Sequence, residues 1–267
     1  KGNKIQNKYF GGLTMSVNKW TREEEIIVFN LYCKIPFQKS SKSHPDVIRI
    51  ANLIGRSPSA VNMKIGNFGS FDETLKVKGI VGLTNASKLD KEIWDEFNGN
   101  WDKLAYLSEK MISELETKPL ESVIDNEKTP LGSDRSATIK QRVNQNFFRK
   151  AVLSSYSSTC CITGLNTRSL LIASHIKPWK ISNETEKTNP RNGLCLNALH
   201  DKAFDKGLIT VSPDYRIQIS QRITDIYYGA TEKRFFKIYQ NQQIIKPEKF
   251  VPDKEFLEYH NDMIFQK

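Results

Sequence analysis

The sequence predicts an α+β protein with an N-terminal helical domain and a C-terminal domain of short strands and helices. Two observations lead to this prediction. Apolar residues before residue 117 recur at helical spacing, and a stretch rich in prolines and acidic residues follows them. Beyond that stretch, apolar runs of strand length alternate with glycines and polar turns, which is typical of mixed strands and helices.

The charge of the chain is strongly basic. The 267 residues carry a formal net charge of +10, and residues 136–267 contain 20 basic and 12 acidic side chains. A positive field of this kind attracts polyanions, with nucleic acid as the default partner. The alternative is a basic surface that serves only solubility, and charge alone does not separate the two.

Composition also bears on the compartment. No apolar run is long enough to span a bilayer, and residues 1–14 lack the apolar core of a secretory signal. Met15 is a plausible native start, so we leave the preceding residues out of the fold prediction. The four cysteines are too few for a disulfide framework, and Cys160 and Cys161 are adjacent rather than spaced as zinc ligands. We expect a cytoplasmic protein with no membrane partner and no structural zinc.

The first predicted helix covers residues 20–37. Thr21 is a suitable N-cap, and Glu24 stands three residues later, as in a capping box. More helix is expected over residues 87–116, with an interruption near Gly99.

Two short helices are expected between these segments, over residues 46–55 and 56–68. Ser57 caps the second one, which exposes Asn62 and Lys64. Three short helices with a glycine-containing turn resemble a helix-turn-helix, and "WTREEE" with "IGRSPSAV" resembles a Myb/SANT-type module. The resemblance implies DNA contact through Asn62 and Lys64. The alternative is a module that contacts other proteins.

The best candidate linker covers residues 117–135, which contain two prolines, a glycine and an acidic excess. We therefore expect a helical DNA-recognition module over residues 15–116. A second domain follows over residues 136–267.

The second domain begins with a predicted helix over residues 139–156. A short strand then starts at Cys160, turns at Gly164–Asn166 and leads into a second strand that ends at His175. The elements expected after that strand are a polar loop over 180–191, a strand over 192–197, a helix over 198–207 and a hairpin over 208–220.

The motifs "ASHIKPW", "NPRNGLCLNALHDKAFDKG" and "NQNFFRKAVLSSYSSTCCITG" resemble the HNH nucleases, in particular the branch typical of restriction endonucleases. The resemblance covers roughly residues 139–210. It implies a ββα-metal fold, a divalent Mg²⁺ or Mn²⁺ ion, and DNA products with 5′-phosphate and 3′-hydroxyl ends.

Phosphodiester hydrolysis needs a base that is unprotonated near neutral pH and a cation that neutralises the phosphate, and histidine suits the first role. The resemblance implies that His175 is the general base. It implies that Asn192 ties the loop to the hairpin and orients that base, and that His200 binds the metal.

One position departs from the family pattern. Many HNH enzymes carry an aspartate or histidine metal ligand directly before the base, where this chain has Ser174. Asp205, five residues beyond His200, is the nearest substitute. A pair spaced i,i+5 shares a helical face poorly, so the helix would have to end early. Asp201 is a weaker option.

Three basic residues flank these positions, namely Lys177, Lys180 and Arg191. They are candidates for contacts to DNA phosphates, although each could equally be a solvated surface charge.

The sequence thus predicts a metal-dependent endonuclease acting on double-stranded DNA, in restriction or phage defence. Two cuts at one site favour a homodimer. One alternative is a DNA-binding regulator with a degenerate HNH fold, which Ser174 suggests. Another is a homing or mobile-element nuclease.

Overall fold

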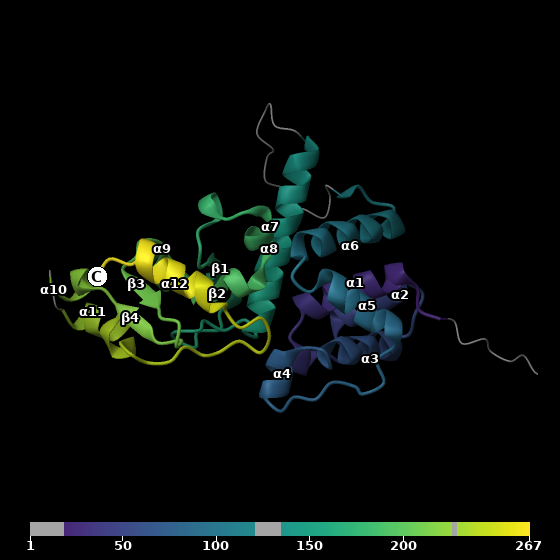
Figure 1. Ribbon diagram of the computed structural model, residues 1–267, viewed down its shortest axis with the longest axis horizontal. Helices are drawn as coiled ribbons and strands as arrows, with labels where there is room; N and C mark the ends of the chain where they lie inside the picture. The colour runs from purple at the N-terminus through teal and green to yellow at the C-terminus, as the bar shows by residue number, and fades with distance from the viewer. Residues whose placement is uncertain (1–18, 121–134, 226–228) are drawn as a thin grey trace, which may run out of the picture.

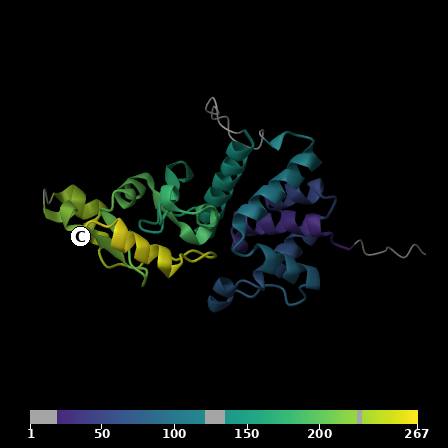
Figure 2. The same ribbon diagram turned by 45° about the horizontal axis from the view of Figure 1, so that its top comes forward.

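A computed structural model describes residues 19–120, 135–225 and 229–267. The N-terminal helices and the strand-containing C-terminal part lie on opposite sides of the long helix α7, Arg135–Ser155, in both views (Figures 1 and 2). Every helix in these ranges is too short or too polar to cross a membrane.

The N-terminal part is a bundle of helices. They are α1 (Arg22–Lys34), α2 (Pro45–Leu53), α3 (Pro58–Gly69), α4 (Glu73–Val77), α5 (Lys88–Phe97) and α6 (Trp101–Glu116). The predicted helices are confirmed, whereas α4 was not expected. The capping box of Thr21 and Glu24 is present, and the Ser57 side chain accepts from the backbone N–H of Ala60 in the first turn of α3. The helix-turn-helix interpretation of α2 and α3 stays a prediction.

This bundle has its own aromatic core. The ring of Phe29 on α1 packs against Phe68, Trp94 and Trp101, with centroids 4.8, 5.4 and 6.4 Å away. All four side chains are buried. Since these rings come from α1, α3, α5 and α6, α1 is the central helix of the bundle.

The second core lies in the C-terminal part, and α7 belongs to both. Its residues Val143, Phe147 and Ala151 pack into the helical bundle. Phe148 and Val152, on another side of the helix, pack into the C-terminal core. The expected domain boundary before residue 136 therefore does not separate the two cores, because α7 contributes side chains to both.

A second connection comes from near the C-terminus. Phe250 packs in the bundle core beside Trp101, with ring centroids 5.2 Å apart. The buried ammonium of Lys249 donates to the carbonyl oxygens of Tyr32 and Ile35, at the end of α1. These bonds satisfy carbonyls that the end of a helix leaves without partners.

The C-terminal part is built on two antiparallel strand pairs. Strand β1 (Leu171–His175) pairs with β2 (Gly193–Asn197), and His175 lies opposite Gly193. Strands β3 (Ile209–Val211) and β4 (Ile217–Ile219) form the predicted hairpin. The helices are α8 (Glu184–Thr188), α9 (Ala198–Asp205), α10 (Gln221–Asp225), α11 (Ala230–Phe235) and α12 (Lys254–Met263).

The α+β prediction is confirmed, with differences in detail. The strand expected from Cys160 is absent, and residues 161–163 form a turn because Cys160 and Cys161 bond to separate partners, the Leu165 and Cys195 carbonyls. The loop expected over 180–191 contains α8. Of the expected linker, residues 121–134 lie outside the described residues.

Candidate active site

The site is organised by β1, β2 and α9, with α7 packed on the sheet (Figure 1). Close packing of α7 depends on Gly193. A Cβ atom at this position would stand 2.4 Å from Cγ2 of Val152 and 3.0 Å from the ring of Phe148. The glycine opposite His175 thus lets α7 approach the end of β1, where the histidine ring lies.

The ring of His175 is held on three sides. It stacks on Phe148 with centroids 3.7 Å apart, and Trp179 meets it edge-on at 5.4 Å. Nε2 lies 3.0 Å from the carbonyl oxygen of Lys187. Because a carbonyl can only accept, Nε2 carries the proton in this bond. Nδ1 of the neutral ring therefore keeps a lone pair that can accept a proton.

Burial lowers the pKa of His175 to about 4, and the bond to the Lys187 carbonyl opposes this shift only in part. The ring is consequently neutral at physiological pH, which is the form that a general base requires.

The side chain of Asn192 is fully buried and joins the sheet to the following loop. Its Oδ1 accepts from the backbone N–H of Lys177 at 2.8 Å. Its Nδ2 donates to the carbonyls of Lys177 and Glu186, each at 3.2 Å. Since Glu186 directly precedes Lys187, these bonds fix the segment whose carbonyl holds His175. These contacts tie the loop to the hairpin, and the positioning role expected for Asn192 stays a prediction.

Lys177 strengthens the same loop instead of projecting from it. Its ammonium contacts both carboxylate oxygens of Glu186, at 2.7 and 2.8 Å. Lys177 is therefore already paired within the protein, which differs from the expected phosphate contact.

His200 lies apart from His175, in a buried position of its own. Its Nε2 donates to the carbonyl of Phe235 at 2.9 Å, and Nδ1 lies 3.0 Å from Oδ1 of Asn197. The ring packs against Phe236 and Tyr239. Burial lowers its pKa. Because the neutral ring carries its proton on Nε2, Nδ1 keeps a lone pair, but this lone pair faces the Asn197 oxygen. His200 is not among the residues that border the cavity beside His175, so this conformation does not present the lone pair to a metal ion there.

The carboxylates near His175 come from Asp201 and Asp205, one helical turn apart on α9. With Ser174 and His175 they border a cavity of about 540 Å³. Burial raises the pKa of Asp201, the Ser174 hydroxyl opposes this shift, and the Asp205 charge adds to it. Burial also raises the pKa of Asp205. The pair shares one helical face, so Asp205 enters the site together with Asp201, not as a partner of His200.

These residues fit a hard divalent cation. The buried Ser174 oxygen has no hydrogen-bond partner of normal geometry among the described residues, although it faces the Asp201 carboxyl. Two carboxylates and a hydroxyl are oxygen donors of the kind that Mg²⁺ and Mn²⁺ prefer. A cation would also relieve the repulsion between the carboxylates. Within the described ranges, no group of three or more His, Cys, Asp or Glu side chains is placed to hold a metal. The remaining ligands would have to be water and phosphate oxygens.

Basic side chains surround this cavity. Lys202 and Lys206, also one turn apart on α9, border it beside the carboxylates. Arg149 of α7 borders a second cavity of about 270 Å³, which His175 and Trp179 share. These cations were not singled out from the sequence. The repeat of Asp-Lys at 201–202 and 205–206 in "HDKAFDKG" was the available signal, because i,i+4 spacing puts both pairs on one face.

The other expected DNA-binding residues are spread over the molecule. Lys180 is exposed beside Trp179. Arg191 points to another face, where it lies 3.7 Å from Asp253 and borders a cavity with Phe71 and Trp94.

The expectation that Lys64 is exposed on α3 is wrong. Its ammonium is buried between Glu25 at 2.9 Å and Asp90 at 2.6 Å. Asn62 is half-buried, and its Oδ1 is shielded from solvent. The helical periodicity indicated a polar face on α3, but it did not indicate that the carboxylates of Glu25 and Asp90, from two other helices, cover Lys64. Neither side chain is presented as a free DNA contact in this structure.

Comparison with known families agrees with this geometry. Residues 160–212 match a family model described as HNH endonuclease. The matched segment contains β1, β2, α9 and β3, and therefore the whole strand–strand–helix unit around His175. The match supports a nuclease domain of the HNH type in this part of the chain and thus a nucleic-acid substrate. No curated protein matches the chain.

Proposed function

We propose that the protein is a metal-dependent endonuclease that hydrolyses phosphodiester bonds of double-stranded DNA. This proposal rests mainly on one observation. His175, whose Nε2–H bonds to the carbonyl of Lys187, borders the same cavity as the carboxylates of Asp201 and Asp205. A proton acceptor and an oxygen-donor pair side by side are what this hydrolysis needs.

In this mechanism, Nδ1 of His175 takes the proton from the attacking water. Phe148 and the Lys187 carbonyl fix the ring, and Asn192 fixes the loop that supplies this carbonyl. Ser174, Asp201 and Asp205 would hold the Mg²⁺ or Mn²⁺ ion, whose chemistry would be to neutralise charge on the scissile phosphate and the departing oxygen. In this proposal they replace His200 as the ligands. His200 supports α9 from its buried side.

Lys202, Lys206 and Arg149 are placed along the cavities to contact neighbouring phosphates. The products would carry 5′-phosphate and 3′-hydroxyl ends. A cytoplasmic homodimer in restriction or phage defence is the biological setting that we propose, since two active sites can cut both strands.

The defining experiment is cleavage of methylated and unmethylated plasmid DNA with Mg²⁺ or Mn²⁺, followed by sequencing of the ends. EDTA should abolish cleavage, and His175→Ala should lower its rate by about two to four orders of magnitude without removing DNA binding.

A second candidate is a DNA-binding regulator with a degenerate HNH fold. The absence of a group of three strong metal ligands among the described residues favours it. Sequence-dependent DNA binding with no cleavage under either metal would support this function instead.

A further inference from the structure

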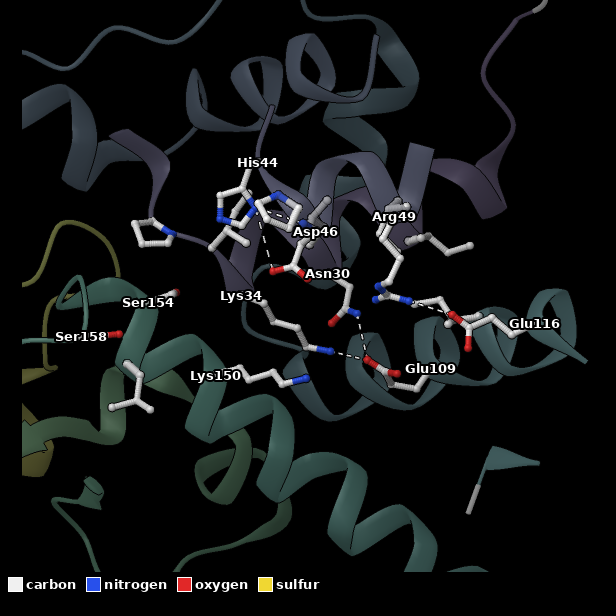
Figure 3. A pocket seen from close by; sticks show the side chains of 18 of the residues that line it. Asn30, Lys34, His44, Asp46, Arg49, Glu109, Glu116, Lys150, Ser154 and Ser158 are labelled. Atoms are coloured by element: carbon white, nitrogen blue, oxygen red, sulfur yellow. Dashed lines mark hydrogen bonds and ion pairs between the residues drawn. The ribbon is translucent and has the colours of Figure 1, made fainter. Parts of the chain in front are cut away.

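A cavity of about 720 Å³ lies between the helical bundle and α7, and bonds within the protein cross it (Figure 3). Lys34 pairs with Glu109, and Arg49 pairs with Glu116. These charges therefore serve the packing of α1, α2 and α6. A smaller cavity at the proposed active site has polar side chains without such partners among the described residues.

The smaller cavity encloses about 270 Å³ and adjoins the proposed catalytic cavity. Ala173, His175 and Trp179 border both of them. A group bound in the smaller cavity, which we call the flanking cavity, would therefore lie next to the scissile phosphate. Its volume equals the share of about nine water molecules in the liquid, which leaves room for one nucleobase but not for a base pair.

The guanidinium of Arg149 is exposed at the rim of the flanking cavity. One of its N–H groups, on Nη2, donates to the carbonyl oxygen of Leu171 at 3.1 Å and thereby fixes its direction. Within the described ranges, Arg149 forms no ion pair with a carboxylate. Its remaining N–H groups can therefore bind a phosphate in a charge-assisted contact.

Gln145 stands one turn before Arg149 on the same face of α7, and it is also exposed at this rim. Its amide bonds to no other residue in the part of the chain that the structure describes. The amide presents a donor and an acceptor side by side, which is the pattern that pairs with the amino group and a ring nitrogen of adenine. Gln145 is thus placed to contact the edge of a base.

Trp179 gives the flanking cavity an aromatic wall that solvent reaches, since its side chain is only half-buried. The edge-on contact with His175 at 5.4 Å holds the indole in place, and the ammonium of Lys187 lies 5.3 Å from the ring centroid. A ring fixed in advance loses little entropy when a ligand packs against it. Unpaired bases in nucleic-acid complexes commonly stack on such aromatic side chains.

We propose that the flanking cavity takes up one unpaired base beside the scissile phosphate, with the base against Trp179, its edge at Gln145 and its phosphate at Arg149. Adenine is the base that Gln145 fits best. This inference rests on the proposed function, which places a DNA strand across His175. In a duplex the base must leave its stack to enter, so the cavity favours sites at which pairing is weak.

The first test uses fluorescence anisotropy with the intact protein and single strands of equal length, namely oligo-dA, oligo-dT and an abasic strand. EDTA is present, so the measurement does not depend on cleavage. We expect oligo-dA to bind about fivefold to a hundredfold more tightly than the abasic strand, the usual effect of one stacked base. Trp179→Ala should bring this ratio close to one, whereas Trp179→Phe should retain most of it.

Gln145→Ala tests the contact with the base edge. The parent protein should bind oligo-dA about fivefold or more tightly than oligo-dT, and this preference should disappear in the variant. Gln141→Ala is the matched control, because Gln141 is exposed one turn earlier on α7 and does not border the cavity. Since Gln145 is exposed, this comparison decides the matter even if Trp179→Ala does not fold.

Arg149→Met should weaken all three strands, the abasic one included, and lower the salt slope by about 0.7, the value for one phosphate contact of a single strand. In duplex DNA, a mismatch at the nucleotide beside the mapped cleavage position should tighten binding by the parent protein and not by Trp179→Ala.

Three results overturn the proposal. They are equal binding of oligo-dA and the abasic strand by the parent protein, a ratio that is unchanged in Trp179→Ala, and an adenine preference that persists in Gln145→Ala. Cleavage of DNA without these base effects would retain the proposed function and reject the flanking cavity as a base site. If the protein cleaves no DNA, the single-strand measurements still decide whether the cavity takes up a base.

Discussion

The Nε2 atom of His175 donates to the carbonyl oxygen of Lys187, 3.0 Å away and twelve residues further along the chain. This bond fixes the tautomer of the ring and leaves Nδ1 as the proton acceptor. It also ties the base to a loop that Asn192 and the Lys177–Glu186 pair hold in place. The predictions that follow test this arrangement and its surroundings.

His175→Ala should lower the cleavage rate by about two to four orders of magnitude, the usual contribution of a general base. DNA affinity and Mn²⁺ affinity should persist, because the ring is bonded within the protein at Nε2 and supplies no carboxylate. The measurement is single-turnover cleavage alongside calorimetric titration of metal into the variant with uncut DNA. Loss of metal binding in this variant would contradict the assignment, because it would make His175 a metal ligand.

Asp201→Asn and Asp205→Asn should each weaken Mn²⁺ binding at least tenfold, since even outer-shell partners of a metal contribute about tenfold to a hundredfold. His200→Gln is the matched comparison on the same helix. It should retain metal affinity but lower the free energy of unfolding by about 0.5–1.5 kcal/mol, because the amide loses the packing of the imidazole ring against Phe236 and Tyr239. Calorimetry and thermal melting of all three variants check this. Loss of metal affinity only in His200→Gln would restore the histidine as the ligand.

DNA affinity should fall linearly with salt on a log–log plot, and Lys202→Ala with Lys206→Ala should make the plot shallower. Each lost phosphate contact should change the slope by about 0.9. Lys64→Met serves as the control, because its ammonium is buried between Glu25 and Asp90. We expect it to destabilise the fold and leave the slope unchanged. Fluorescence anisotropy at several salt concentrations gives the slopes, and an unchanged slope in the double variant would contradict the assignment.

Glu25 should make the helical bundle lose stability as pH rises from acid to neutral. Burial raises the pKa of its carboxyl to about 7, with the Lys64 bond opposing and the Asp90 charge adding to that shift. A carboxyl with a raised pKa stabilises the fold at low pH, and this contribution is lost as pH rises from about 4.5 through 7. Glu25→Gln stays neutral, so it should melt at a higher temperature than the parent at pH 8 and at a similar temperature at pH 5. Glu92→Gln is the control, because the Glu92 side chain on α5 is about half exposed to solvent. A temperature difference that does not depend on pH would contradict this prediction.

A fragment starting at residue 136 should not behave as an independent domain. Separation from the bundle would expose apolar side chains that pack there, namely those of Val143, Phe147, Ala151 and Phe250. We expect the fragment to bind a hydrophobic dye and to aggregate, in contrast to the intact chain. Cooperative melting of the fragment at the temperature of the intact protein would instead support the two separate domains that the linker composition suggests.

The sequence by itself determined the local elements of this protein. Helical periodicity and the caps at Thr21 and Ser57 were sufficient for the bundle, because capping depends on residues three positions apart. The order of strand, loop, strand and helix around His175, Asn192 and His200 was equally readable, and the family match covers the same segment.

Only the tertiary structure decided which side chains meet. Lys64 has a polar position on α3, yet Glu25 and Asp90 from two other helices bury it. His200 faces Phe235 on the far side of α9, whereas Asp201 and Asp205 face His175. The rotation of a short helix about its axis is set by packing against distant segments, and neighbouring residues point about 100° apart on it. A pattern along the chain specifies that such a helix forms, but its packing partners specify which face becomes the site.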